Sequence, residues 1–152
     1  MKIESTRFGT LEITEEDILH FPLGIPGFLN EKEFVLLPHG ADSPFSFLQS
    51  VKEPNLSFLL VDPFAFYKDY EFKLDDILVR EMELTEENPP QVWVIATIKE
   101  NIKDMTVNLL APIILNTQKR EGRQIILEQS PYSIRHKLFA ESTGTKVPGG
   151  GK

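Results

Sequence analysis

Carboxylates are the most concentrated chemical groups in this sequence. Eight of them fall within residues 69–87, against only two cations, Lys73 and Arg80. Two carboxylates can serve as general acid and base when burial separates their pKa values, but this segment has the composition of exposed chain, where such tuning is weak. A dense acidic segment instead attracts a basic protein and repels nucleic acid, and the alternative is a solvated helix face and loop. The candidate partner-binding acids are Asp69, Glu71, Asp75, Asp76, Glu81 and Glu83.

Aromatic residues surround the start of this acidic segment. Over residues 64–72 they are interleaved with Asp69, Glu71 and Lys68, and Asp62 and Lys73 lie on either side. Rings that stack on RNA bases sit among cations, so this mixed pattern fits a protein partner better. The alternative is that the rings cap one end of a β-barrel. The candidate aromatic anchors are Phe45, Phe64, Phe66 and Tyr67, and Phe64 is preferred because Asp62-Pro63 places it on a turn.

The remaining patterns do not favour catalysis or metal binding. The histidines His20, His39 and His136 have no further ligand at metal-binding spacing, and the chain has no cysteine. No Gly-x-Ser-x-Gly nucleophile motif is present. Residues 119–123 place three cations at a predicted hairpin tip, which suits a phosphate or carboxylate but also an ordinary solvated turn. We therefore predict a protein that is not an enzyme and holds no metal or cofactor.

Composition limits the class of protein. The chain has 152 residues, 41% hydrophobic and 26% charged, as expected for one globular domain. Its net charge of −7 is uneven, with −4 over residues 1–40, −7 over residues 41–90 and +4 over residues 91–152. Nucleic-acid binding needs a positive field, so we expect no direct nucleic-acid contact. No apolar run approaches the roughly 20 residues that span a bilayer, so we expect a cytoplasmic protein without membrane contact. The 11 phenylalanines exceed what a small β core readily absorbs, which favours a partner surface.

Short β-prone runs separated by turn residues dominate the chain. A first hairpin is expected to turn near Gly9, and Thr14–Asp17 has the pattern of a capping box at a short helical turn. Leu74, Ile77 and Leu78 recur at helical spacing and predict one short amphipathic helix. Further strands are predicted over residues 33–37, 45–51, 56–61, 91–99, 104–110, 113–116 and 123–127.

The stretch Asn108–Asn116 indicates the fold most clearly. Its apolar residues leave no position to face water, so it is buried on more than one side, and Pro112 argues against a helix. A polar turn follows, in which Gly122 can take a positive φ, and Gln124–Leu127 then resumes in β-prone residues. We predict a mainly all-β fold, a small and partly open antiparallel β-barrel or β-sandwich with one or two short helices. The domain spans residues 1–137, and a flexible tail follows over residues 138–152.

The motifs also resemble those of one known family. Phe21–Phe28 and Asn108–Asn116 are similar to stretches of the flagellar assembly factor family (FliW), whose fold is a small β-barrel-like domain. Other similar motifs occur in the family's order across residues 1–137, namely Phe34–Pro38, Asn55–Phe58, Val61–Phe64 and Gln124–Leu127. The resemblance implies a cytoplasmic, non-enzymatic regulator of flagellum biogenesis. Members bind newly made flagellin, and when freed they bind and antagonise the carbon storage regulator (CsrA), an RNA-binding repressor of flagellin translation.

Two further expectations remain open from the sequence. We expect the protein to be a monomer when free. The alternative function is a small-ligand-binding or hydrolytic β-barrel protein with its pocket near Gly24–Phe28, where two glycines and two prolines in and beside the segment predict a tight irregular loop. A deep cavity lined by convergent polar groups would favour that alternative, and a surface of aromatic and acidic residues would favour the regulator.

Overall fold

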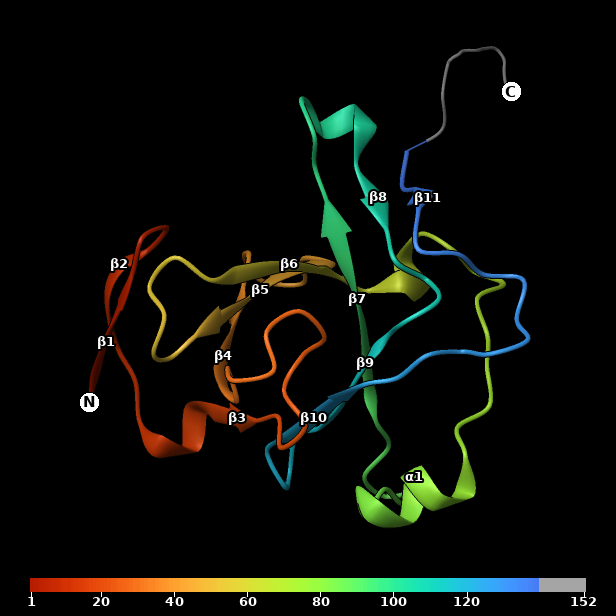
Figure 1. Ribbon diagram of the computed structural model, residues 1–152, viewed down its shortest axis with the longest axis horizontal. Helices are drawn as coiled ribbons and strands as arrows, with labels where there is room; N and C mark the ends of the chain where they lie inside the picture. Colours follow the sequence, from red (N-terminus) through yellow and green to blue (C-terminus); the bar gives the residue numbers. More distant parts are fainter. Residues whose placement is uncertain (140–152) are drawn as a thin grey trace.

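The computed structural model describes residues 1–139. This part of the chain folds mainly as β-strands, with one short α-helix and three 3₁₀ turns, which confirms the predicted fold class (Figure 1). The strands are β1 Lys2–Ser5, β2 Gly9–Glu12, β3 Ile18–His20, β4 Glu33–Pro38, β5 Phe45–Ser50, β6 Ser57–Val61, β7 Gln91–Thr97, β8 Thr106–Val107, β9 Ile113–Asn116, β10 Glu121–Gln124 and β11 His136–Lys137. The helices are η1 Glu15–Asp17, η2 Pro63–Ala65, α1 Asp76–Glu81 and η3 Ile102–Asp104.

Seven strands form a closed barrel. Its wall runs in the order β7-β6-β5-β4-β3-β10-β9, and β9 returns to β7 to close it. Closure depends on β7, whose first residues pair with β9 and whose last residues pair with β8 along the same edge. Two details differ from the sequence prediction. The barrel is closed rather than partly open, and β3 and β10 lie parallel, joined at His20 and Glu121.

The barrel interior is filled by apolar side chains that alternate along the strands. Phe21 and Phe34 lie at its centre with their rings edge to face, 5.3 Å apart. Gly122 of β10 lies directly beside them, because a Cβ there would stand 2.4 Å from the Phe21 ring. The glycine of the β9–β10 hairpin is therefore needed for close packing, and the positive φ expected there belongs to Arg120 instead (59°). The buried interior residues are Leu19, Phe21, Ile25, Phe34, Leu48, Leu60, Ile113 and Leu115.

The loop Leu23–Phe28 is irregular, as predicted, and it contributes to the barrel interior. Gly24 and Gly27 both have positive φ, and a Cβ on Gly24 would meet the Leu29 backbone at 2.6 Å. This tight path turns Ile25 inward, where only 1% of its surface is exposed. The loop thus supplies a core residue, which is a structural role for a motif that resembles the FliW family.

Three further apolar clusters pack around the barrel. The β1–β2 hairpin packs through Ile3 on Ile18 and Val35. The segment after β6 packs over β7 and β8 together with the end of the described chain. Helix α1 covers Ile114 from the outside, so β9 is buried on both faces as its apolar run predicted. Figure 1 shows the hairpin at the left, α1 at the lower right and the β7–β8 hairpin projecting upward.

Several predicted boundaries shift. The strand expected over residues 104–110 is reduced to β8, because the Asn108 side chain accepts hydrogen bonds from the backbone N–H groups of Leu110 and Ala111 and turns the chain. The strand expected over residues 123–127 begins and ends earlier, as β10. Within the predicted tail, Leu138 is buried and Phe139 packs on Phe66, so these two residues pack with the domain. The rest of that tail lies outside the described residues.

Candidate functional site

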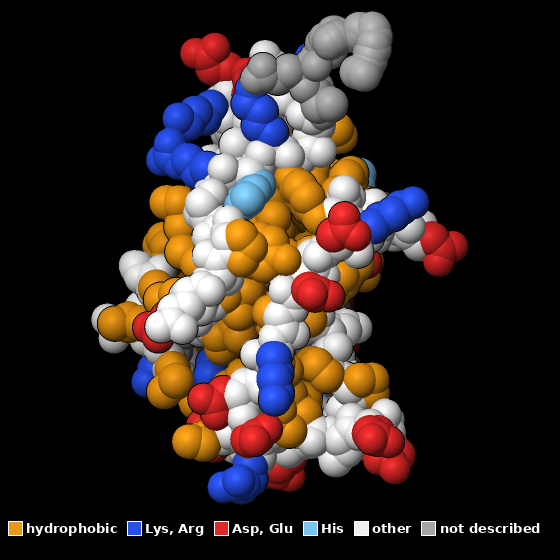
Figure 2. All heavy atoms as spheres, turned by 90° about the vertical axis from the view of Figure 1, so that its right-hand side faces the viewer, with side chains coloured by type: hydrophobic (Ala, Val, Ile, Leu, Met, Phe, Trp, Pro, Cys, Tyr) orange, Lys and Arg blue, Asp and Glu red, His pale blue; other side chains and the backbone are white. Residues whose placement is uncertain are grey.

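A groove of about 590 Å³ lies between α1 and the extended chain that follows β10. Its floor is apolar, and its rim carries the carboxylates of Glu71, Asp75, Glu81 and Glu128 against Lys73 and Arg123. Figure 2 shows this side of the molecule, with hydrophobic side chains gathered along its middle and Asp and Glu side chains along its edges. We call it the acidic groove. Its apolar lining comes from Phe72, Ile77, Leu78, Ile125, Ile126, Leu127 and Tyr132.

Helix α1 is held at its start by one of these acids. Asp75 is the N-cap residue, and its side chain accepts a hydrogen bond from the Ile77 N–H at 2.7 Å. A carboxylate at this position also interacts favourably with the positive end of the helix dipole. The helix buries Leu78 but leaves Ile77 60% exposed in the groove. The predicted amphipathic helix is present, but Ile77 faces the groove and not the core.

Tyr132 fixes the other wall of the acidic groove. Its hydroxyl accepts from the Glu71 N–H at 3.0 Å and donates to the Glu71 carbonyl at 3.2 Å. Its ring also packs against Tyr70 at 4.7 Å. Tyr70 is buried, and its hydroxyl donates to the Leu109 carbonyl at 2.8 Å. Burial, and then the nearby Tyr132 phenol, raise the pKa of Tyr70 well above its ordinary value.

Two of the predicted acids are already paired within the chain. Arg123 on β10 lies 2.8 Å from Glu81, and Lys119 in the β9–β10 turn lies 2.7 Å from Glu83 and 3.7 Å from Glu121. The hydrogen bond to Glu83 is the main reason that the pKa of Lys119 is raised. The basic hairpin tip and the acidic segment, which appeared separate in the sequence, therefore partly neutralise each other.

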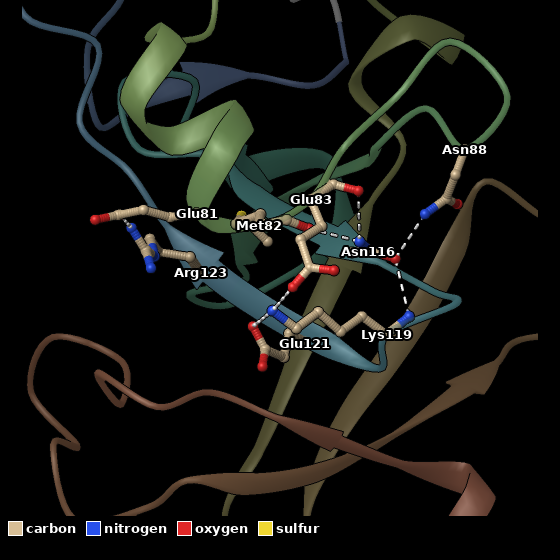
Figure 3. Close-up of polar contacts among 8 residues, drawn as sticks. All are labelled: Glu81, Met82, Glu83, Asn88, Asn116, Lys119, Glu121 and Arg123. Carbon is tan, nitrogen blue, oxygen red and sulfur yellow. Dashed lines mark hydrogen bonds and ion pairs between the residues drawn. The ribbon is translucent and has the colours of Figure 1, made fainter.

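Asn116 joins this hairpin to the end of α1 (Figure 3). Its amide donates to the Met82 carbonyl at 2.6 Å, and its oxygen accepts from the Asn88 side chain at 2.8 Å and from the Lys119 N–H at 2.9 Å. All of these bonds are made by a residue that is almost fully buried. The acidic segment is thereby fixed against the barrel, including Glu83 at a φ of 55°.

The ten candidate residues do not form one surface. Glu71, Asp75 and Glu81 line the acidic groove, whereas Asp69 and Asp76 are exposed outside its lining. No cation of the described chain pairs with Glu71, Asp75 or Glu128 within 4 Å. Glu128 and the apolar residues 125–127 were not among the candidates. Residues 125–127 were expected to be strand, and the alternation of a strand does not show which of its faces is covered.

The four aromatic candidates differ in their burial. The rings of Phe45 and Phe66 pack on each other at 5.8 Å and against the cluster over β7 and β8. Tyr67 is half-buried, its hydroxyl donates to the Lys137 carbonyl, and burial raises its pKa. Phe64 alone among the four is exposed, at 46%. It protrudes because the Asp62 carboxylate accepts from the Phe64 N–H at 3.0 Å and caps a 3₁₀ turn behind buried Pro63.

Other chemistry finds little support in this part of the structure. Among residues 1–139, no three His, Cys, Asp or Glu side chains lie close enough together to hold a metal ion. The same residues include no helix long and apolar enough to cross a membrane. Within this range the acidic groove combines an apolar lining with uncompensated carboxylates, and its composition suits a protein segment.

Comparison with known sequences decides the family. The sequence profile described as FliW protein matches residues 2–138. This chain belongs to the FliW family. The flagellar assembly factor FliW of Desulfitobacterium hafniense strain Y51 is 64% identical over 152 residues, which is the full length of both chains. The FliW of Heliobacterium modesticaldum is 44% identical over 151 residues, or 99% of each chain, and that of Bacillus subtilis strain 168 is 43% identical over 142 residues, or 93% of this chain and 99% of the relative.

A solved FliW structure has the same fold. The crystal structure of the flagellar assembly factor FliW superposes with a TM-score of 0.86 at 44% identity, covering 93% of this chain and 99% of that one. In this chain, the stretches that resemble the family serve mainly the barrel. Phe21 and Ile25 fill its interior, and Asn116 ties it to α1. Of these stretches only Gln124–Leu127 reaches the acidic groove, through the side chains of residues 125–127.

Proposed function

We propose that this FliW-family protein is a non-enzymatic flagellar assembly factor that acts in the cytoplasm as a partner-switching regulator. It binds newly made flagellin, and when free of flagellin it binds the carbon storage regulator CsrA and relieves repression of flagellin synthesis. Membership of a family whose relatives are named flagellar assembly factors supports the flagellar role. The choice of partners comes from the family resemblance and from the chemistry of the acidic groove.

The acidic groove is the observation that carries this proposal. A protein that binds RNA must present lysine and arginine side chains to phosphates. Such a surface would place its cations against Glu71, Asp75 and Glu128 at the rim, and apolar residues between the cations could bury against Ile77 and the floor. The same charges would repel the messenger RNA. The protein would therefore act by occupying the regulator, and it would make no contact with the RNA.

Flagellin binding has a separate support. Phe64 presents an exposed aromatic ring on a capped turn, with its ring 5.7 Å from that of Tyr70. Aromatic side chains held in one conformation are frequent anchors of protein interfaces, because little entropy is lost on binding. Phe64 lies outside the lining of the acidic groove, so the two partners need not use identical residues.

A gel shift with purified components tests the proposal. The regulator is first bound to flagellin leader RNA, and this protein is then added without and with flagellin. We expect the RNA to be released by the protein alone and to be bound again when flagellin is also present. The protein without regulator should leave the RNA unshifted, because its net charge is −7. Retardation of the RNA by the isolated protein, or no release from the regulator, would contradict the proposal.

The alternative of a hydrolytic or small-ligand protein has less support. A second groove of about 500 Å³ does lie beside the predicted loop, at Ile25 and Pro26. Its lining includes no histidine, cysteine, aspartate or glutamate, so no acid and base converge there. Its chemistry is that of apolar residues with two cations at the rim, which suits binding better than catalysis.

A further inference from the structure

This second groove differs from the acidic groove in charge. Its lining is largely apolar, with Phe58, Ile95 and Ile134 among its residues. Two cations, Lys99 and Arg135, also line it, and no carboxylate does. The net charge of the whole chain is −7, so the positive charge of this groove is opposite in sign to that of the chain. We call it the basic groove.

Its two cations have no carboxylate partner within the part of the chain that the structure describes. No acid of residues 1–139 lies within 4 Å of the Lys99 ammonium or the Arg135 guanidinium, whereas Lys119 and Arg123 are each paired. A cation beside an apolar surface and without a counter-charge is available to a carboxylate from outside. Two cations are too few to hold a nucleic-acid backbone, whose binding depends on many phosphate contacts. The chemistry therefore favours a protein segment that carries carboxylates.

Ile126 lines both grooves, and on one edge its backbone offers the N–H, while its carbonyl already accepts from the Glu128 N–H at 3.1 Å. The N–H groups of Ile125 and Leu127 donate to the carbonyls of Pro112 and Leu110, so this extended segment continues the ladder of β10. Successive N–H groups of an extended strand point to opposite edges, so the N–H of Ile126 points away from Pro112. It has no acceptor among the described residues. The Ile126 side chain is 64% exposed and lines both grooves.

The edge at Ile126 is unpaired because β10 loses its neighbour β3 after a single residue pair. β3 pairs with β10 at the single position His20–Glu121 and then leaves for the loop that carries Ile25. Beyond Glu121, β10 and its extension have no strand on that side, and the basic groove opens there beside Ile25 and Pro26. An unpaired edge next to an apolar groove is the arrangement used in recognition by strand addition.

We propose that the basic groove is a second docking site, which takes an extended segment of a partner protein with apolar and acidic residues in alternation. The segment adds along the edge at Ile126, its apolar side chains fill the groove over Phe58, and its carboxylates reach Lys99 and Arg135. This site goes beyond the proposed function and stands whether or not the acidic groove binds the carbon storage regulator. Because Ile126 borders both grooves, an occupant of one would contact the edge of the other.

Three labelled peptides test this site with the full-length chain. The first alternates valine with glutamate over ten residues, the second replaces each glutamate with glutamine, and the third replaces each with lysine. We expect fluorescence anisotropy to show that the glutamate peptide binds at least about tenfold more tightly than the glutamine peptide. The double variant Lys99→Glu/Arg135→Glu should reduce binding of the glutamate peptide by about tenfold or more. Binding of the glutamate peptide to the unmodified chain should weaken as salt rises.

A matched control separates contact from general charge. Lys103→Glu makes the same charge change as Lys99→Glu alone, half that of the double variant, on the same β7–β8 hairpin as Lys99, but Lys103 does not line the groove. It should alter binding by less than about threefold. Ile134→Ser removes an exposed apolar residue that lines only the basic groove, and it should weaken binding of all peptides that enter there. Thermal melts should show each variant folded.

The backbone contact has its own readout. If a peptide strand adds at this edge, hydrogen exchange at the Ile126 amide should slow when the glutamate peptide is bound. The proposal fails if the glutamate peptide binds no better than the glutamine peptide. It fails equally if the Lys99→Glu/Arg135→Glu variant binds as the unmodified chain does, or if Lys103→Glu has the same effect as that double variant.

Discussion

The side-chain amide of Asn116 donates a hydrogen bond to the Met82 carbonyl at 2.6 Å and so joins the end of β9 to the end of α1. The same side chain accepts hydrogen bonds from Asn88 and from the Lys119 backbone (Figure 3). One buried residue thereby satisfies polar groups of its own β9–β10 turn and of the segment after α1, which lies 28 to 34 positions earlier in the sequence. Because α1 forms one wall of the acidic groove, the shape of the groove depends on this residue.

Replacement of Asn116 by alanine should lower the free energy of unfolding by about 1–3 kcal/mol, because the Met82 carbonyl would lose its donor in a buried place. Urea denaturation followed by circular dichroism measures the change. Asn30→Ala is the matched control, since Asn30 is exposed and makes no hydrogen bond among the described residues. A loss for Asn116→Ala no larger than that of the control would show that α1 is held by its apolar contacts alone.

Phe64 and Phe45 should respond differently to truncation. Phe45→Ala should cost roughly 3 kcal/mol of stability, near the lower end for phenylalanine because its ring is only partly buried. Phe64→Ala should leave the melting temperature nearly unchanged and weaken binding to flagellin or the regulator by about 2 kcal/mol or more. Calorimetry and a binding titration on both variants check this. If Phe64→Ala melts early and binds in proportion to its folded fraction, the ring serves the fold.

Charge reversal in the acidic groove should slow association with the regulator. Glu71→Lys/Glu128→Lys changes two rim carboxylates that have no cation partner within the described chain. It should lower the association rate by about tenfold at low salt and reduce the dependence of that rate on salt. These residues are preferred to Glu81 and Glu83, because reversing either of those would also break an ion pair with Arg123 or Lys119.

The matched variant for this experiment is Glu86→Lys/Glu87→Lys. It changes the net charge by the same amount at two exposed residues outside the groove. We expect it to slow association clearly less than the groove variant does, as measured by stopped-flow fluorescence at several salt concentrations. Equal effects of the two double variants would mean that the regulator responds to overall charge and does not contact the groove.

Stability should fall at alkaline pH through Tyr70. Burial raises the pKa of Tyr70 in the folded protein above that of an unfolded tyrosine, which is about 10. Its contribution to stability is therefore complete below about pH 10 and is lost as pH rises toward the folded pKa. Unfolding in urea at pH 8 and pH 11 should show a smaller pH-dependent loss in Tyr70→Phe than in the unmodified chain. An identical loss in both would assign the alkaline sensitivity to other groups.

The same variant should be less stable at neutral pH. Tyr70→Phe leaves the Leu109 carbonyl without its donor, and about 1–2 kcal/mol of stability should be lost. The two results together separate the hydrogen bond, which acts at every pH below the titration, from the ionisation, which acts only above it.

Local patterns in the sequence predicted much of the fold. The hairpin near Gly9, the turn at Thr14–Asp17 and the irregular loop Leu23–Phe28 all appear where glycine, proline or capping residues placed them. These features depend on the conformations open to a few neighbouring residues. The strand β9 is also buried on both faces, because a run without polar positions has no side to turn toward water.

The candidate site was predicted less well, for a physical reason. Helical spacing placed Ile77 together with Leu78, but only contact with Ile114 decides which of them is covered. In the same way, nothing near Gly122 in the sequence shows that the ring of Phe21 will fill the space beside it. Burial of a side chain depends on what the remainder of the chain brings to it.

By itself, the sequence determined the strand-forming segments, the tight turns and the acidic excess of this protein, because these follow from local conformational preference and from composition. Only the tertiary structure decided the closure of β7 on β9, the pairing of Glu81 with Arg123, and the two grooves on either side of Ile126. Each of these joins residues more than fifteen positions apart, and their meeting depends on the packing of the whole barrel.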